Sequence, residues 1–343
     1  MRFRIRQLKK VLSNRRARLK VLKIATWVNA ALLLALYLME TRLAESTWLT
    51  GLAAYAPQCF FGIPLAILLV WSIAERRRWT ILANVGAAIL FSVTLLGFNV
   101  PLGRSHGGRV IRMMTYNLRQ GERGIRKIAR VIQDVNPDIL CVQEVNAWDK
   151  WGDPVWQLEQ LIPGWHMVRD GELATFSRHP IISSSVHYLS AGTQRAVLAA
   201  RIRIAGRELD VLNTHFNIAS ERHLCVWYHD AAPSRIRHTA SVMAAQAWEL
   251  IRVAAPCSNA LVIAGDLNMP PRWNAYRLIE DRYRDAFRAA GWGLGCTFPA
   301  NLPVTRIDHI FLGPAIGAKR CFVPRTRASD HRPVVADLVI GVR

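Results

Sequence analysis

Three long apolar runs within the first 102 residues constrain this chain more than any other feature of its sequence. They cover about Val21–Met39, Leu49–Ala74 and Trp79–Leu102. Each is close to the ~20 residues with which an α-helix crosses ~30 Å of hydrocarbon. Because a backbone in lipid must satisfy its own hydrogen bonds, the runs predict three transmembrane helices in a membrane region of residues 21–102. The alternatives are a cleaved signal peptide for the first run and buried core helices for the other two.

The charges between these runs predict how the chain crosses the membrane. A basic N-terminus of residues 1–20 holds nine Lys or Arg and no acid, and the turn 75–78 holds three Arg. The turn 40–48 instead holds one Arg and two Glu. By the positive-inside rule, the N-terminus and the turn 75–78 face the cytoplasm, so the chain after residue 102 is expected outside it. DNA binding by the basic N-terminus is a less economical explanation than contact with anionic lipid.

Composition narrows the class of the rest of the chain. A content of 51% hydrophobic and 20% charged residues excludes a disordered or fibrous protein. Residues 109–343 carry a net charge of +9, which suits anionic substrates, although no basic stripe with interleaved aromatic residues singles out nucleic acid. The cysteines are dispersed without the spacing of zinc sites, so isolated buried thiols are expected. A disulfide among the last four requires an oxidising compartment.

After a linker of residues 103–108, the chain alternates between strand-like and helix-like segments. Apolar residues at helical spacing predict a helix over 125–135, and the run 138–145 reads as a buried strand. Further strands are expected near 110–117, 172–177, 181–189, 196–204, 208–215, 260–266, 305–312 and 333–341, and further helices near 153–162, 235–253 and 273–289. Such a mixture predicts one layered α/β domain with two sheets over residues 109–343.

Polar side chains recur at the ends of these strands. They are Asn117, Glu144, His215, Asp266, Asn268, Asp308, Asp330 and His331. Ligand sites of open α/β sheets form beyond the strand ends, so these side chains are expected to converge. Taken singly, each has a structural explanation as a turn residue, a strand cap or a hydrogen-bonded core histidine. Their recurrence at one strand end after another favours a functional site.

Some of these residues are suited to a metal and to phosphate. Glu144 and Asp330 offer the hard oxygen ligands that Mg²⁺ or Mn²⁺ prefers. The amides of Asn117 and Asn268 can donate neutral hydrogen bonds to phosphate oxygens. The chain has no serine or cysteine nucleophile motif, no P-loop and no glycine-rich dinucleotide loop.

The remaining residues of the set are suited to proton transfer. Asp308 can orient His331, which makes an Asp–His pair that acts as a general base or proton relay. Asp266 is a candidate to hold or activate an attacking water, and His215 can stabilise charge on the phosphate.

Seven motifs in order carry a family resemblance: MTYNLR, VQEV, SRHPI, NTHF, GDLN, RIDHIF and SDHRPV. Together they resemble the endonuclease/exonuclease/phosphatase superfamily, which includes DNase I-like nucleases, exonuclease III-like enzymes, neutral sphingomyelinases and inositol polyphosphate 5-phosphatases. The resemblance covers roughly residues 109–343. It implies a four-layer α/β/β/α sandwich and divalent-metal hydrolysis of phosphate esters.

The resemblance also implies roles for the site residues. Glu144 would be the principal metal ligand, and His215 and His331 the catalytic histidines, with Asp308 supporting His331. The residues around the metal and the phosphate would be Asn117, Asp266, Asn268 and Asp330. The membrane spans would be an addition, as in bacterial membrane-bound members.

We therefore expect a multi-pass protein of a bacterial inner membrane with an extracytoplasmic, Mg²⁺- or Mn²⁺-dependent phosphoesterase domain. Its partners would be the lipid bilayer and a phosphate ester, either nucleic acid or a lipid head group. The motifs favour a nuclease-like phosphodiesterase. The alternatives are a phospholipid, sphingomyelin-type or inositol-phosphate phosphoesterase, and a non-catalytic membrane binding protein on the same fold.

Three further features need an interpretation, and the first two depart from the family pattern. The tyrosine-bearing loop of abasic-site endonucleases has no clear counterpart. An insert of residues 217–237 is a candidate to line the substrate cleft, against the alternative of an ordinary loop. Arg178 and Arg195 are candidates for phosphate contact, against the alternative of strand-edge solvation.

Overall fold

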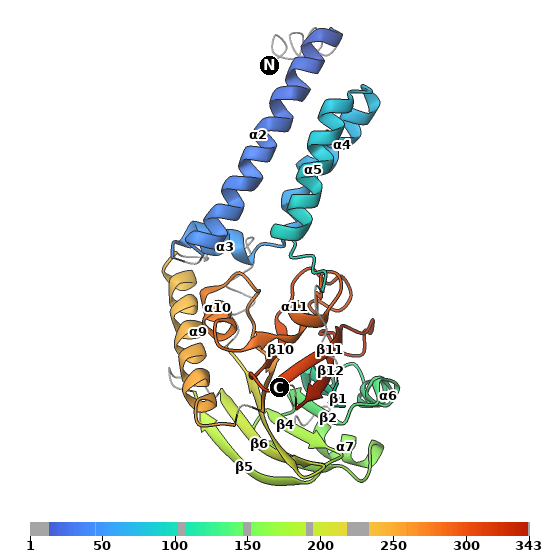
Figure 1. The fold of residues 1–343 in the computed structure, drawn as a ribbon, viewed down its shortest axis with the longest axis vertical. Helices are drawn as coiled ribbons and strands as arrows, with labels where there is room; N and C mark the ends of the chain where they lie inside the picture. Colours follow the sequence, from blue (N-terminus) through green and yellow to red (C-terminus); the bar gives the residue numbers. More distant parts are fainter. Residues whose placement is uncertain are drawn as a thin grey trace. The chain divides into compact units, whose positions relative to one another are not determined.

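The computed structural model describes residues 14–44, 46–101, 107–146, 152–189, 195–217, 233–258 and 260–341. The chain divides into two compact units. We call Met1–Leu43 with Ala56–Phe98 the helical unit, and Ala44–Tyr55 with Asn99–Arg343 the sandwich unit. Figure 1 labels the elements of both.

In its described residues, the helical unit contains three α-helices held together by apolar and polar contacts. They are α2 (Arg15–Arg42), α4 (Ile63–Ala74), which follows the 3-10 turn η1 (Gln58–Gly62), and α5 (Arg78–Thr94). Asn14 begins α2, because its side chain accepts hydrogen bonds from the first-turn backbone. Leu65 and Phe91 form the apolar core. Beside it, the Asn84 amide donates to Thr26 Oγ1 at 3.2 Å and to Ser72 Oγ at 3.1 Å, which links all three helices.

The prediction of three full-length transmembrane helices is wrong. Among the described residues, only the 28-residue α2 is long and apolar enough to cross a membrane by itself. The second run is divided into α3 (Trp48–Tyr55) and the η1–α4 segment, because Pro57 lies between them and disfavours helix at the residue before it. The third run leaves the helix after Thr94 and becomes extended near Asn99.

The sandwich unit contains two six-stranded sheets. The first has the order β11-β12-β1-β2-β4-β3. Its strands are β1 (Arg109–Asn117), β2 (Ile139–Gln143), β3 (His166–Asp170), β4 (Leu173–Ser177), β11 (Ile316–Phe322) and β12 (Val334–Ile340). The second has the order β5-β6-β7-β8-β10-β9. Its strands are β5 (Ile181–Tyr188), β6 (Ala196–Ile204), β7 (Arg207–His215), β8 (Leu261–Asp266), β9 (Arg284–Asp285) and β10 (Asp308–Leu312).

Helices cover the outer faces of both sheets. One apolar core fills the space between the sheets, with Met113 and Ala336 facing Val211 and Ala264. A second core joins the first sheet to α6 (Ile125–Val135) and α7 (Pro154–Leu161). A third joins the second sheet to α9 (Pro233–Ala254) and α10 (Asn274–Glu280). The unit is therefore the mixed α/β sandwich with two sheets that was predicted, with helix, sheet, sheet and helix as its layers.

Two local predictions in this unit differ from the structure. The segment 273–289 is not one helix but α10, the short strand β9 and α11 (Ala286–Ala290). Asp285 separates the helices, because its side chain accepts from the backbone of Phe287 and Arg288 and starts α11 as a new helix. The strands β3 and β11 were not predicted, since both are outermost strands and carry exposed residues between apolar ones.

Two further expectations concern cysteines and the insert. Cys59, Cys141, Cys257, Cys296 and Cys321 are free thiols. Cys141 and Cys321 are buried as predicted, but Cys59 is exposed and Cys257 and Cys296 are partly exposed. Cys225 and most of the insert 217–237 lie outside the described residues, as does most of the linker 103–108. The segment Ala44–Tyr55 was expected in the membrane region, but it belongs to the sandwich unit, where α3 packs on α9 and Ala54 is buried.

Candidate active site

Strand register brings the predicted polar side chains to one edge of the sandwich. β1 and β2 are parallel and end together, with Asn117 opposite Gln143. β7 and β8 are also parallel, with His215 opposite Asp266. The antiparallel strand β10 begins at this same place, with Asp308 opposite Asp266. Because parallel strands finish at the same edge of a sheet, short turns after them leave their polar residues clustered.

Asp266 lies at the centre of the cluster and belongs to two groups of possible metal-binding side chains. One group contains Glu144, His215 and Asp266, and the other contains Asp266, Asp308 and His331. Within each group, one ligand atom per residue lies within 4.8 Å of the others. The Asp266 carboxylate is 1% exposed, and its Oδ2 is 3.7 Å from Nε2 of both His215 and His331. Burial and the Asp308 carboxylate raise the pKa of Asp266.

Two amide side chains orient the carboxylates and one imidazole. Asn117 Nδ2 donates to Glu144 Oε1 at 2.9 Å and to Asp266 Oδ2 at 3.0 Å. Asn268 donates through its backbone N–H to Asp266 Oδ1 at 3.0 Å, and its Nδ2 lies 3.2 Å from His215 Nε2. Glu144 and Asn268 both adopt left-handed backbone conformations, with φ of 54° and 51°. These turns direct their side chains back over the strand ends.

His331 and Asp308 form the expected pair. His331 Nδ1 is 3.0 Å from Asp308 Oδ2, and the Phe298 ring packs against the imidazole with 4.8 Å between ring centroids. Burial alone would lower the pKa of His331, but the Asp308 and Asp266 carboxylates outweigh it and raise that pKa to about 10. The imidazole is therefore positively charged at neutral pH, with Nε2 directed to the Asp266 side of the cluster.

The donor atoms suit a hard divalent cation. Glu144 and Asp266 share a single amide donor in Asn117 Nδ2, which leaves further carboxylate lone pairs for a metal ion. The two carboxylates supply the hard oxygen ligands that suit Mg²⁺ or Mn²⁺. The geometry therefore fits a metal at Asp266 and Glu144, and the His331–Asp308 pair lies on the other side of Asp266.

The family model decides the class of the protein. A model described as the Endonuclease/Exonuclease/phosphatase family matches residues 114–331, a stretch that includes every site residue predicted from the sequence. The chain belongs to the endonuclease/exonuclease/phosphatase family. Members of this family are hydrolases of phosphoesterase or nuclease type. None of the curated proteins with which the chain was compared matches it.

Solved structures show the fold of this family over the sandwich unit. An endonuclease/exonuclease/phosphatase family protein from Bacteroides thetaiotaomicron is 19% identical, with 69% of this chain and 100% of that one covered and a TM-score of 0.57. A humanized D. rerio TDP2 is 14% identical, with 67% and 98% covered and a TM-score of 0.54. The human Nocturnin catalytic domain with bound sulfate anion is 18% identical, with 70% and 99% covered and a TM-score of 0.51. At such identities the likeness shows the fold alone.

Seven of the eight predicted site residues in this family member contact one another, and Asp330 is the exception. It lies outside both groups of possible metal ligands. Its Oδ2 instead accepts from Arg119 Nη1 at 2.7 Å, and its Oδ1 accepts from Ser329 Oγ at 3.2 Å. Ser329 Oγ also lies 2.8 Å from the Asn117 carbonyl, so the Asp330 segment is held against the end of β1. A metal-binding role for Asp330 stays a prediction.

One residue of the site was missed by sequence reasoning. Glu172 precedes β4, and its Oε2 lies 3.2 Å from His215 Nδ1. Arg195 Nη1 contacts both Glu172 and His215, the latter at 2.6 Å. Burial would raise the pKa of Glu172, but His215 and Arg195 outweigh it and lower that pKa to about 2. The only signal in the sequence is a lone acid in a tight turn before a buried strand, which is too common to single it out.

The two arginines proposed for phosphate contact have structural partners. Arg195 contacts Glu172 and His215, which places it behind the histidine. Arg178 donates from Nε to the Pro137 carbonyl at 3.0 Å, and its guanidinium lies over the Trp165 ring. Arg178 therefore anchors a loop of the first sheet.

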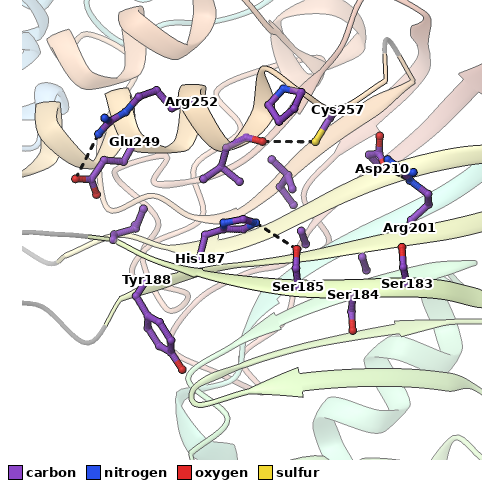
Figure 2. Close-up of a pocket in the computed structure, with 16 residues that line it drawn as sticks. Ser183, Ser184, Ser185, His187, Tyr188, Arg201, Asp210, Glu249, Arg252 and Cys257 are labelled. Carbon is purple, nitrogen blue, oxygen red and sulfur yellow. Dashed lines mark hydrogen bonds and ion pairs between the residues drawn. The ribbon is translucent and has the colours of Figure 1, made fainter.

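A separate cavity of about 830 Å³ lies between β5, β6 and α9 (Figure 2). Its two lining carboxylates are already paired, Asp210 with Arg201 at 2.7 Å and Glu249 with Arg252 at 3.8 Å. His187 points to Ser185 (Figure 2). Among the described residues, no group able to hold a metal lines this cavity. The Asp266 cluster is therefore the candidate active site of this family member.

Proposed function

We propose that this protein is a divalent-metal-dependent phosphodiesterase that hydrolyses phosphate esters at a membrane surface. The observation that carries the proposal is the position of Asp266, which is shared between a carboxylate–imidazole group and the His331–Asp308 pair. A single buried carboxylate then serves both the binding of a cation and the movement of a proton. A non-catalytic binding protein would have no need of this combination.

The side chains divide the reaction between them. The oxygen of a water molecule attacks phosphorus, and the bond from phosphorus to the leaving oxygen breaks. Asp266, whose pKa burial and Asp308 raise, accepts a proton from the water. His331 donates its Nε2 proton to the leaving oxygen and recovers one from Asp266, whose Oδ2 is 3.7 Å away. Asp308 holds the other ring nitrogen and keeps the imidazole in position.

The remaining residues bind the phosphate and the cation. The amides of Asn117 and Asn268 point into the cluster, and a phosphate oxygen that replaces one of their present acceptors there would receive a neutral donor. His215 is held from behind by Glu172 and Arg195, so its Nε2 faces the cluster. Glu144 and Asp266 would hold Mg²⁺ or Mn²⁺, with Asp330 as the further predicted ligand. Such an ion acts as a Lewis acid that stabilises negative charge on the phosphate oxygens.

The helical unit supports the membrane location. Large apolar side chains of α2, α4 and α5 are exposed, among them Leu32, Ile67 and Leu90. A surface of this kind is stable in lipid and costly in water. Arg18 near the start of α2 donates to Glu75 in the α4–α5 turn at 2.9 Å, so the start of α2 and the basic turn 75–78 lie at one end of the unit. The positive-inside rule then assigns this end to the cytoplasm, with α2 crossing the bilayer and the sandwich unit outside.

The proposal is tested with the full-length protein in detergent, using bis(4-nitrophenyl) phosphate as a soluble diester. We expect hydrolysis that a chelator abolishes and that Mg²⁺ or Mn²⁺ restores. Asp266→Asn should lower the rate by ~10²–10⁴. Glu144→Gln should instead raise the metal concentration needed for half-maximal rate, because it removes one ligand charge.

The matched control is Asp134→Asn, which makes the same chemical change on the exposed side of α6. It should leave the rate and the metal dependence unchanged. Hydrolysis that is insensitive to the chelator, or equal in wild type and Asp266→Asn, would refute the proposal.

A further inference from the structure

The segment Gly291–Val304 exposes three large apolar side chains on the sandwich unit. Trp292 is 67% exposed, Leu294 39% and Leu302 73%. Other exposed aromatic residues of this unit, such as Trp156 and Tyr188, lie on separate elements. Isolated exposed apolar side chains are ordinary on soluble proteins, whereas three within one short segment mark an interaction surface. We call Trp292, Leu294 and Leu302 the apolar lip.

One end of this segment is bonded to the residue that leaves the helical unit. Asn99 directly follows Phe98, the last residue of that unit. The Asn99 and Gly293 backbones exchange two hydrogen bonds, of 2.8 and 2.9 Å. The Asn99 side chain also donates to the Gly291 carbonyl at 2.7 Å. Trp292 and Leu294, on either side of Gly293, are therefore bonded close to Asn99, the first residue of the sandwich unit after the helical unit.

The other end of the segment is bonded to the candidate active site. The Ala300 N–H donates to the Asp330 carbonyl at 2.6 Å, and the Arg332 N–H donates to the Thr297 carbonyl at 2.8 Å. Phe298 packs on the His331 imidazole. The hairpin that carries Leu302 at its tip therefore borders the histidine proposed to protonate the leaving group.

Basic side chains accompany the apolar lip. Arg325 and Arg327 are exposed and lie within electrostatic range of Arg332. Arg332 Nε donates to the Ala300 carbonyl at 3.0 Å, inside the same hairpin. Exposed tryptophan and leucine beside clustered arginine are the side chains that favour the head-group layer of an anionic membrane.

We propose that the apolar lip lies in the head-group layer of the bilayer and that the substrate is a membrane-embedded phosphate ester. This inference rests on the proposed function for its substrate class. The membrane contact of the lip is independent of catalysis. It follows from the backbone hydrogen bonds between Gly293 and Asn99, because Asn99 directly follows the last residue of the helical unit. A lipid phosphate then meets the active site beside Phe298, while its acyl chains stay in the membrane.

Membrane contact is tested without any use of activity. The full-length protein is reconstituted into vesicles of phosphatidylcholine and phosphatidylglycerol, with or without lipids brominated near the head group. The fluorescence of Trp292 is obtained as the difference between wild type and Trp292→Phe. We expect bromine to quench this difference signal. The matched control is Trp156→Phe on α7, an element that Figure 1 shows away from α11 in the sandwich unit. The Trp156 signal should not be quenched.

The substrate class is tested by a ratio of rates. In the same vesicles, kcat/KM is measured for a phosphodiester carried on diacylglycerol and for soluble bis(4-nitrophenyl) phosphate. Trp292→Ser with Leu302→Ser should lower the ratio of lipid to soluble rates by at least ~tenfold, since each buried side chain contributes ~1.5–3 kcal/mol and 1.4 kcal/mol is a factor of ten. Trp156→Ser should not change this ratio.

The outcomes separate the two proposals. Quenching of Trp292 with no hydrolysis of either ester supports the membrane contact and refutes the proposed function. Hydrolysis with an unchanged ratio and no quenching refutes the apolar lip as a membrane surface and leaves the proposed function standing. A preference for single-stranded DNA over the lipid ester, lost in Trp292→Ser, would show that the lip stacks on bases and would overturn the inference.

Discussion

The helical unit and the sandwich unit distribute the same kinds of side chain in opposite ways. In the helical unit, large apolar residues such as Leu32 and Leu90 are exposed, while Thr26, Ser72 and Asn84 are buried and bonded to one another. In the sandwich unit, the apolar residues fill three cores between and outside the sheets. The difference corresponds to two solvents. Water drives apolar burial, whereas in lipid helices associate through close packing and a few polar contacts.

Buried charge sharpens this contrast. The Asn84 cluster in the helical unit is neutral and small, and Glu40 of α2 is also buried there. The described part of the sandwich unit buries several ionic groups, among them the Asp266 cluster and a separate pair of Asp285 with Arg306. Burying a charge is costly unless it is paired or used. The Asp285–Arg306 pair is satisfied and structural, whereas the Asp266 cluster keeps spare acceptors for a cation. Substitutions in the Asp266 cluster are therefore expected to lower activity, and substitutions in the Asp285–Arg306 pair to lower stability.

The largest effect is expected in the Asp266 cluster. His331→Ala should reduce kcat on a soluble diester by ~10²–10⁴, because it removes the proton donor to the leaving oxygen. The thermal unfolding midpoint should change little by comparison. His166→Ala, an exposed histidine of β3, is the matched control and should retain wild-type turnover. Wild-type turnover in His331→Ala would remove this residue from the mechanism.

The next largest effect concerns the structural pair. Burial raises the pKa of Asp285, but the adjacent Arg306 and His309 outweigh it and hold that pKa well below its usual range. Asp285→Asn should therefore cost ~3–5 kcal/mol in the free energy of unfolding at neutral pH, since it leaves a buried cation without its partner. The measurement is thermal or denaturant unfolding of the full-length protein in detergent.

The same pair predicts a pH dependence. A carboxylate with a lowered folded pKa contributes stability above its unfolded pKa of ~4 and loses it as the pH falls toward the folded value. Wild type should thus lose this contribution below about pH 4. The difference in free energy of unfolding between wild type and Asp285→Asn should therefore become smaller there. Asp281→Asn, an exposed neighbour, is the control. A gap that widens on acidification would contradict the assignment.

The smallest effect compares two buried asparagines directly. Asn213 lies between the sheets, where its Nδ2 donates to the Ala174 carbonyl at 2.9 Å and its Oδ1 accepts from Gln143 Nε2 at 2.7 Å. Asn213→Leu should cost ~1–3 kcal/mol, because Gln143 is left unsatisfied. Asn84→Leu in the helical unit should cost less, ~0.6–1.7 kcal/mol. The free energies of unfolding of both variants are measured in the same detergent. A larger loss of stability in Asn84→Leu than in Asn213→Leu would contradict the comparison.

The sequence was informative about the site because strand ends are local signals. Asn117, His215 and Asp266 each close an apolar run, and Glu144 and Asp308 stand at the boundary of another. Parallel pairing of β1 with β2 and of β7 with β8 converts these separate signals into one edge. The structure places the residues as expected, and their roles in catalysis stay predictions.

The membrane region was predicted less well than the sheets. Hydropathy is an average over a window, and it does not register that Pro57 interrupts the second run. It also does not register that Asn99, inside the third run, has hydrogen-bond partners almost two hundred residues away in the chain. Both corrections depend on polar backbone groups, which a hydropathy scale leaves out.

What the sequence determined by itself is therefore a set of local properties. Periodicity and turn residues placed most strands and α6, the charge pattern separated two kinds of region, and ordered motifs identified the family. These signals arise from interactions over a few residues, where side-chain spacing and backbone preference act directly. Such signals can be recognised without knowledge of the tertiary contacts between distant parts of the chain.

The tertiary structure alone decided which side chains share a partner. Asp266 is common to two groups, Asp330 turns to Arg119 and Ser329, and Glu172 supports His215. Each of these contacts joins residues far apart in sequence. Their geometry depends on the register of two sheets and on the turns between them, which balance many weak contacts across the whole unit. Local preferences cannot specify such contacts, because the same side chains have other acceptable partners until the sheets close.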